Sequence, residues 1–118
     1  MAIGYWQSSN SQLPIANSSA NPRLRNRIEH AQVLQPSDIA RFAAQGVIAS
    51  MQPIHCTSDY KMVDAYWGGR GRYAYAWRDL LNSGARLALG SDAPVESFDP
   101  LVGIHAAVTR QRGDGSPA

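Results

Sequence analysis

Three short apolar runs are separated by longer stretches in which apolar residues recur with a helical period. The runs have the length of strands, and proline follows two of them within a few residues, which ends a paired strand. The first run is the least apolar, because Glu29 occupies a position where a strand packed on both faces favours an apolar residue. The three runs are residues 27–31, 47–51 and 87–89.

The stretches between the runs predict helices. Residues 36–46 begin with proline, carry apolar residues at helical spacing and end at Gly46. A strand, a helix and a second strand in this order predict a right-handed parallel crossover, and therefore an α/β fold. Two further helices are predicted: one from the stripe Tyr73, Trp77, Leu80 and Leu81 with Gly84 as its cap, and one that opens at Asp99 and Pro100 and presents Leu101, Ile104 and Val108.

Residues 54–72 show no clear period. An irregular segment of this length is unusual in a compact domain and tends to be functional, so we interpret it as an active-site loop on the catalytic face. Its glycine-rich part, residues 68–71, does not fit a phosphate-binding loop, because neither a preceding strand nor a Lys-Ser/Thr pair accompanies it.

Two residues with catalytic potential follow predicted strands. Asp92 follows the run 87–89 after Gly90 and Ser91 and shares one face with Ala88 and Gly90, which leaves room for a ligand or a metal. The carboxyl ends of parallel strands are where ligands and catalytic groups collect. His30 ends the run 27–31 in the same way. The alternatives are an Asp92 that caps a turn and a His30 that is a hydrogen-bonded structural residue.

Composition is that of a globular chain. The 118 residues are 44% hydrophobic and 17% charged, with a net charge of +2, which suits one small domain and does not indicate a nucleic-acid partner. No apolar run approaches the roughly 18 residues that span a membrane, and no secretory leader is visible, so we expect a cytoplasmic protein. The single cysteine, Cys56, excludes an internal disulfide; a zinc ligand and a nucleophile are alternatives to the commoner buried free thiol.

Three regions are expected along the chain. Residues 1–26 are a Ser/Asn-rich stretch interrupted by prolines, which we interpret as an irregular leader. Residues 27–112 hold the predicted strands and helices, and residues 113–118 are a tail that is expected to fray.

Several motifs can be read together: Arg-Ile-Glu-His-Ala-Gln at 27–32, Gln-Pro-Ile-His at 52–55 with Ser-Asp at 58–59, Ala-Tyr-Ala-Trp-Arg at 74–78, Gly-Ser-Asp-Ala-Pro-Val-Glu at 90–96, and Ala-Val-Thr-Arg at 107–110. They resemble the C-terminal barrel portion of metal-dependent amidohydrolases of family 3, the group that includes N-substituted formamide deformylases. The resemblance covers residues 23–113.

The resemblance implies a partial (β/α)₈ TIM-type barrel of about three consecutive parallel β/α units, strands six to eight. His30 would end strand six and bind metal. Asp92 would end strand eight, bind metal and move protons as the catalytic residue. His55, in the strand-seven segment, would line the pocket and orient the substrate or the developing oxyanion. The residues expected to bind substrate are His55, Asp59, Trp67 and Arg70.

The implied activity is hydrolysis of a non-peptide carbon–nitrogen bond in a small amide-type molecule by a metal-activated water, with zinc as the expected divalent metal. The family's His-x-His pair, its acidic or carboxylated-lysine ligand and its strand-five histidine have no match here. Met1 and Tyr5 stand where the strand-five motif has histidine and an acid. We therefore expect a C-terminal fragment or truncated reading frame that is inactive alone and binds zinc weakly.

A second class of function stays open. An open three-stranded α/β unit leaves strand edges unpaired and apolar faces uncovered, which favours association. The alternative is therefore a non-catalytic association module or remnant that pairs with itself or with an N-terminal half-chain.

Overall fold

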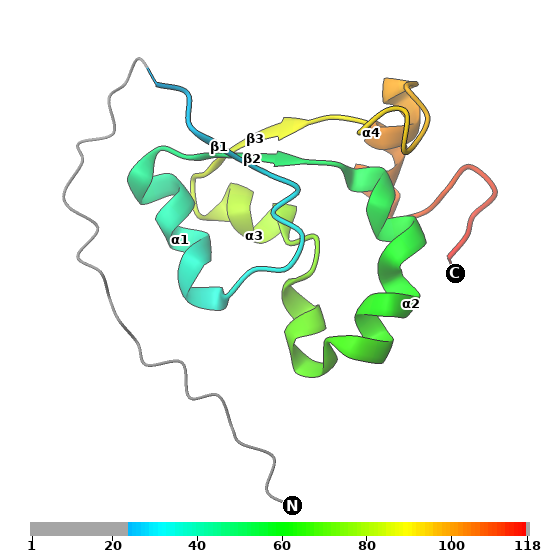
Figure 1. Ribbon diagram of the computed structural model, residues 1–118, viewed down its shortest axis with the longest axis horizontal. Helices are drawn as coiled ribbons and strands as arrows, with labels where there is room; N and C mark the ends of the chain where they lie inside the picture. The colour runs from blue at the N-terminus through cyan, green and yellow to red at the C-terminus, as the bar shows by residue number, and fades with distance from the viewer. Residues whose placement is uncertain (1–23, 118) are drawn as a thin grey trace, which may run out of the picture.

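Three parallel strands form one sheet at the centre of the molecule (Figure 1). The structure is a computed structural model that describes residues 24–117, so most of the leader expected at residues 1–26 lies outside the described residues. The strands occur in the order β1-β2-β3, and each pairs in parallel with the next. They are β1 (Arg27–Glu29), β2 (Ile48–Met51) and β3 (Arg86–Leu89). The predicted parallel α/β fold is confirmed.

Two of the helices in the connections between the strands, α1 and α3, lie on the same side of the sheet (Figure 1). Helix α1 (Pro36–Gln45) begins with proline and ends at Gly46, whose left-handed φ of 64° allows its N–H to bond back to the last turn. Helix α3 (Trp77–Asn82) precedes β3. Ser83 donates a hydrogen bond to the carbonyl of Ile39 in α1, at 3.4 Å, which links the two helices.

The register places side chains on two faces of the sheet. Ile28, Ala49 and Leu87 lie side by side across the strands, and the next row is Glu29, Ser50 and Ala88. Because side chains alternate along a strand, these rows point to opposite faces. Ala49 and Leu87 pack into the core with the helices, so the row that ends at Ala88 faces away from them.

The core lies between the sheet and its helices. Met51 and Leu80 are fully buried, and both belong to one continuous apolar cluster. The other buried members of the cluster are Ala31, Phe42, Ala49, Cys56, Val63, Ala74, Tyr75, Trp77 and Ala85. Cys56 is a buried free thiol, as the commoner of its alternatives predicted.

The prediction of an irregular active-site loop at residues 54–72 is wrong. A short 3₁₀ turn (Pro53–His55) leads directly into helix α2 (Cys56–Tyr66), and a second 3₁₀ segment follows (Gly68–Tyr73). Within α2 only Cys56, Thr57 and Val63 are buried, so the chain shows no wide apolar stripe by which a helix is recognised in a sequence. Figure 1 shows α2 leading away from the carboxyl-terminal edge of the sheet.

The stripe predicted from Tyr73 to Leu81 is also only partly correct. Tyr73 lies in the 3₁₀ segment, and Tyr75 has a left-handed φ of 53°, which no α-helix accommodates, so α3 begins at Trp77. Leu81 is exposed, whereas Leu80 is fully buried. Gly84, the predicted cap, follows the helix with a φ of 86°.

Helix α4 (Pro100–Thr109) begins where the sequence predicts. The side chain of Asp99 accepts a hydrogen bond of 2.9 Å from the N–H of Leu101, which is the expected N-cap. Its predicted apolar face is uncovered, because Leu101 and Val108 are 70% and 80% exposed. Leu89, at the end of the apolar run 87–89, is also half exposed. Within residues 24–117, no helix combines the length and the apolar character needed to cross a membrane.

Candidate metal centre

Three side chains meet at the carboxyl-terminal edge of the sheet. They are His30, His55 and Asp92, and one possible ligand atom from each lies within 4.8 Å of the other two. Each follows a different strand, because parallel strands direct all their exits to the same edge. The structure thus brings together the predicted metal ligands His30 and Asp92, and adds His55 to them.

His30 and Asp92 leave their strands in left-handed backbone conformations, with φ of 64° and 58°. Histidine and aspartate tolerate this region better than most residues, but it still costs energy relative to a right-handed conformation. The N–H of His30 donates a 2.7 Å hydrogen bond to the carbonyl of Ser50, which fixes the turn. Strained residues persist where surrounding structure holds them, and such residues cluster at functional sites.

His55 reaches the same point by a longer route. After β2, Gln52 extends the chain, and the turn that begins at Pro53 places His55 at the start of α2. Its Nε2 lies 3.2 Å from Oδ2 of Asp92, and its ring centroid lies 6.0 Å from that of His30. The His55 side chain is only 13% exposed, so its orientation is restricted by packing.

A second carboxylate stands on the other side of His55. Oε1 of Glu96 lies 4.0 Å from Nδ1 of His55. The imidazole therefore stands between two acidic groups, Asp92 and Glu96. The charge of Glu96 is partly balanced by Arg112, which lies 3.8 Å from it, whereas Asp92 belongs to the cluster, where its carboxylate favours a cation.

Glu96 is held in place by two residues from distant segments. The hydroxyl of Ser58 in α2 donates a 3.0 Å hydrogen bond to Oε1 of Glu96. Arg112, which follows α4, donates a 2.6 Å hydrogen bond to the Ser58 hydroxyl and lies 3.8 Å from Glu96. Sequence reasoning assigned no role to these three residues; the only signal was that Glu96 and Ser58 fall inside the motifs that contain Asp92 and Asp59.

The remaining predicted site residues lie elsewhere. Asp59 accepts hydrogen bonds on the same carboxylate oxygen from the Gln32 amide, at 2.8 Å, and from the Tyr75 hydroxyl, at 2.5 Å. Its oxygen therefore joins α2 to two other segments. Burial and the bond to Asp59 raise the pKa of Tyr75, which keeps its hydroxyl protonated as a donor. The substrate-binding role of Asp59 stays a prediction.

Trp67 and Arg70 lie beyond the far end of α2. The Arg70 guanidinium stacks over the Trp67 ring, 4.8 Å from its centroid. Since α2 spans 11 residues and a helix rises about 1.5 Å per residue, about 16 Å of helix separates these side chains from His55. The structure does not bring them together with the histidine–aspartate cluster, and their role in substrate binding stays a prediction.

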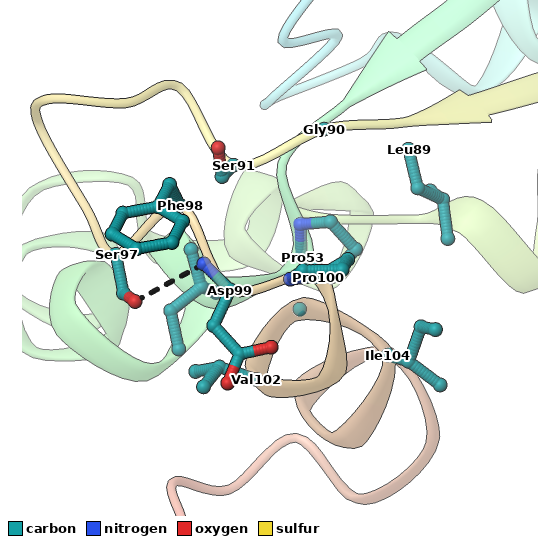
Figure 2. A pocket seen from close by; sticks show the side chains of 12 residues that line it. Pro53, Leu89, Gly90, Ser91, Ser97, Phe98, Asp99, Pro100, Val102 and Ile104 are labelled. Atoms are coloured by element: carbon teal, nitrogen blue, oxygen red, sulfur yellow. Dashed lines mark hydrogen bonds between the residues drawn. The ribbon is translucent and has the colours of Figure 1, made fainter.

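An apolar groove lies next to the cluster rather than at it (Figure 2). It lies between the exit of β3 and the start of α4, where the N–H of Asp99 bonds the Ser97 hydroxyl at 3.2 Å. Its lining is mostly apolar and includes Pro53, Leu89, Phe98 and Ile104. None of the three clustered side chains lines it.

Cys56 is also outside the cluster. Burial raises the pKa of its thiol, which disfavours a nucleophilic thiolate.

The donor types and spacing fit a divalent metal. Imidazole nitrogen and carboxylate oxygen are ligands that zinc and neighbouring transition metals accept. Such ligands bind zinc at about 2.0–2.2 Å, so donors that share one ion lie about 3–4 Å apart. The His55–Asp92 pair already has this separation, at 3.2 Å. His30 is exposed, and one of its ring nitrogens lies within 4.8 Å of the ligand atoms of the other two residues.

Parallel strands that bring two imidazoles and a carboxylate to one edge define an α/β protein with a site suited to a divalent metal. Within that class, the chain belongs to the amidohydrolase family: the model described as "Amidohydrolase family" matches residues 12–117. The family resemblance seen in the motifs is thereby confirmed. The match begins inside the segment that the sequence indicated as a leader.

Two curated proteins are similar to the chain. It is 40% identical over 87 residues to "Putative amidohydrolase YtcJ" of Bacillus subtilis (strain 168), which covers 73% of this chain and 16% of that protein. It is 40% identical over 98 residues to the Arabidopsis thaliana protein LONG AFTER FAR-RED 3, which covers 81% of this chain and 17% of that protein. The chain thus spans about one sixth of the length of these relatives.

Two crystal structures are similar as well, each of an uncharacterized metal-dependent hydrolase. The one from Pyrococcus horikoshii OT3 has a TM-score of 0.66 and 32% identity, and covers 74% of this chain and 18% of that chain. The one from Pyrococcus furiosus has a TM-score of 0.65 and 33% identity, and covers 80% and 20%. At these identities the likeness extends to the sequence as well as the fold.

Proposed function

We propose that this chain supplies three donors, His30, His55 and Asp92, to the metal centre of a hydrolase that cleaves non-peptide carbon–nitrogen bonds. The observation that carries the proposal is the convergence of these donors within 4.8 Å at the carboxyl-terminal edge of a parallel sheet. The family, and the metal-dependent hydrolases among its structural relatives, support the same reaction class. The substrate class is a small amide-type molecule.

Zinc is the proposed metal, because three protein ligands with nitrogen and oxygen donors match the composition of catalytic zinc sites. A divalent metal at such a site lowers the pKa of a coordinated water toward about 7 and polarises a carbonyl oxygen. His55 enters the proposal as a ligand, whereas the sequence alone favoured a role in orienting substrate. The 3.2 Å distance between Nε2 of His55 and Oδ2 of Asp92 supports this role.

Asp92 has the position for proton transfer. Its side chain is 37% exposed, and its Oδ2 lies 3.2 Å from Nε2 of His55. A carboxylate so placed accepts a proton from the attacking water and delivers it to the departing nitrogen, which an amine leaving group requires. His55 limits the rotation of Asp92 and thereby orients the oxygen that moves the proton.

The sheet is proposed to be part of a (β/α)₈ barrel, with β1, β2 and β3 as strands six, seven and eight. Three observations support this arrangement: the strands are parallel and consecutive, helices α1 and α3 lie on one side of the sheet, and the candidate site lies at the carboxyl-terminal edge. In barrels of this kind the active site occupies that edge.

Calorimetric zinc titration tests the metal centre. The chain is expected to bind one zinc ion, and His30→Ala, His55→Ala and Asp92→Asn are each expected to weaken binding about tenfold or more, because each removes one ligand. His105→Ala is the matched control, since His105 is exposed on α4 and outside the cluster. Absence of zinc binding, or an equal loss in the His105 variant, would overturn the proposal.

Co-expression tests the hydrolase activity. The chain alone is expected to lack amide hydrolysis, since most of a barrel's pocket walls come from other strands. Together with an amino-terminal barrel segment that carries a His-x-His pair, metal-dependent hydrolysis of a small N-substituted amide is expected, and Asp92→Asn should abolish it. Activity that survives Asp92→Asn contradicts the assigned proton transfer.

A further inference from the structure

We propose that Asp59 is a positioning residue, which keeps the connections that carry His30 and His55 close enough to share a metal. The inference rests on the proposed function, because it concerns the metal centre described there, but the contacts that carry it exist without a metal. It assigns to Asp59 a task that needs no contact with substrate. The partners of Asp59 are Gln32, two residues after His30, and Tyr75.

Asp59 joins the two histidine connections directly. It follows His55 by four residues in α2, about 6 Å farther along the helix. The side-chain amide of Gln32 donates a 2.8 Å hydrogen bond to its Oδ2. On the other side of the histidines the chain is fixed by the sheet, where the N–H of His30 donates to the carbonyl of Ser50 in β2. The Gln32–Asp59 bond therefore closes a loop that contains both imidazoles.

The turn after β1 needs an anchor beyond it. His30 and Ala31 both have left-handed φ values, of 64° and 43°, and a strained turn persists only where surrounding contacts hold it. Gln32, which follows the turn, is bound twice: its amide donates to Asp59, and its carbonyl accepts a 2.8 Å hydrogen bond from the N–H of Tyr75. Loss of the Asp59 carboxylate removes the contact that ties this turn to α2.

Tyr75 gives Asp59 a fixed point to bind. It is buried, and its hydroxyl donates to the same Oδ2 that accepts from Gln32. Its carbonyl accepts a 2.8 Å hydrogen bond from Arg110 at the end of α4, and the Arg110 guanidinium stacks over the Trp77 ring, 4.2 Å from its centroid. A carboxylate suits this junction because it is an acceptor with several lone pairs and takes both donors at once.

Proton NMR of the metal-free chain gives the first test. The ring protons of His30 and His55 are expected to show a nuclear Overhauser effect (NOE), since the ring centroids lie 6.0 Å apart. Asp59→Ala is expected to abolish this NOE, whereas Asp59→Asn, whose side-chain oxygen still accepts both donors, is expected to retain most of it. Asp64→Ala, which removes an exposed carboxylate from the same helix, is the matched control and should leave the NOE unchanged.

Variants of the partners separate positioning from substrate binding. Tyr75→Phe and Gln32→Leu each keep the Asp59 carboxylate and remove one of its donors, so each is expected to weaken the NOE in part. They also test the proposal if Asp59→Ala does not fold. A full NOE in both variants overturns it, because Asp59 would then act without these contacts.

A core substitution separates positioning from general stability. Phe42→Leu shortens a buried side chain in α1 and is expected to lower stability in urea unfolding while leaving the His30–His55 NOE intact. If Phe42→Leu weakens the NOE as much as Asp59→Ala does, the effect of Asp59 is one of stability alone and the proposal is overturned.

Zinc titration of the same variants completes the experiment. Asp59→Ala is expected to weaken zinc binding about fivefold, and Asp59→Asn and Asp64→Ala to change it by less than about twofold. An unchanged NOE in Asp59→Ala overturns this inference even when the wild-type chain binds zinc. A wild-type chain that binds no zinc, but whose NOE is lost in Asp59→Ala, overturns the proposed metal centre and supports the positioning, so the two failures are distinguishable.

Discussion

Two of the three clustered residues adopt backbone conformations that side chains disfavour. His30 and Asp92 have left-handed φ values, and Ala31, next to His30, has a φ of 43°. Such conformations cost of order 1–3 kcal/mol each and persist only where other contacts hold them. At His30 the holding contact is the bond from its N–H to Ser50 on the neighbouring strand. The turn that orients the imidazole is therefore maintained at the expense of stability.

Glycine at position 30 should reveal this cost. His30→Gly is expected to be more stable than His30→Ala by about 0.5–1 kcal/mol, because glycine adopts left-handed φ without steric strain, partly offset by the greater freedom of its unfolded chain. Urea unfolding measures the difference. The control pair is His105→Gly and His105→Ala in α4, where the order should reverse. A His30→Gly chain less stable than His30→Ala contradicts the strain.

The residues of the cluster differ in how visible they are to sequence reasoning. Asp92 could be predicted because it stands at the exit of an apolar run, and His30 because it stands at the exit of a strand in the same way. His55 was placed in the pocket by family resemblance, but its contact with Asp92 depends on the 3₁₀ turn after β2, which no periodic pattern signals. The carboxylate of Glu96 is bound by Ser58, which lies 38 residues away in the chain, and Ser58 is bound by Arg112, 54 residues from it. The position of Glu96 therefore depends on tertiary structure.

At the scale of elements, predictions succeeded where local signals fix the ends. Proline at the start and Gly46 at the end delimit α1, and Asp99 caps α4 as expected. They failed for α2, because only three of its residues are buried, and for the start of α3, where the left-handed Tyr75 interrupts the helical stripe. Burial and backbone conformation at these positions are set by neighbouring segments and leave no period in the sequence.

The end of α1 offers a quantitative test at this scale. Gly46→Ala is expected to destabilise the chain by about 1 kcal/mol, because alanine is strained at a φ of 64° although no atom lies within 4 Å of the added carbon. Gly103→Ala in α4 is the matched control, with equally open space and a helical backbone, and it should stabilise by about 0.5–1 kcal/mol. Thermal or urea unfolding distinguishes the two; equal effects would contradict the capping role of Gly46.

The whole molecule leaves apolar surface uncovered. Several large side chains on α4 and its approach are exposed: Val95, Phe98, Leu101, Ile104 and Val108. The strands β1 and β3 are also edge strands, each paired on one side among residues 24–117. Open edges and apolar patches favour association. This supports the self-association proposed for the chain, whether its partner is a second copy or another part of a barrel.

Light scattering after size-exclusion chromatography tests this association. The chain is expected to form oligomers whose mass rises with concentration, and Leu101→Glu combined with Val108→Glu should shift it toward the monomer, since charge on both sides of the α4 face opposes its burial. Tyr66→Glu is the control, an equally exposed position in α2. A wild-type chain that remains a monodisperse monomer at all concentrations contradicts the expectation.

The three clustered side chains stand on separate connections, one after each strand, while the strands themselves keep their register through backbone bonds. A substitution in one connection can therefore remove one of these side chains without changing the strand pairing. With the proposed metal centre in place, single changes of this kind would alter its preference among metals or abolish metal binding. The sheet would keep its shape throughout, so preserved architecture alone does not guarantee preserved chemistry.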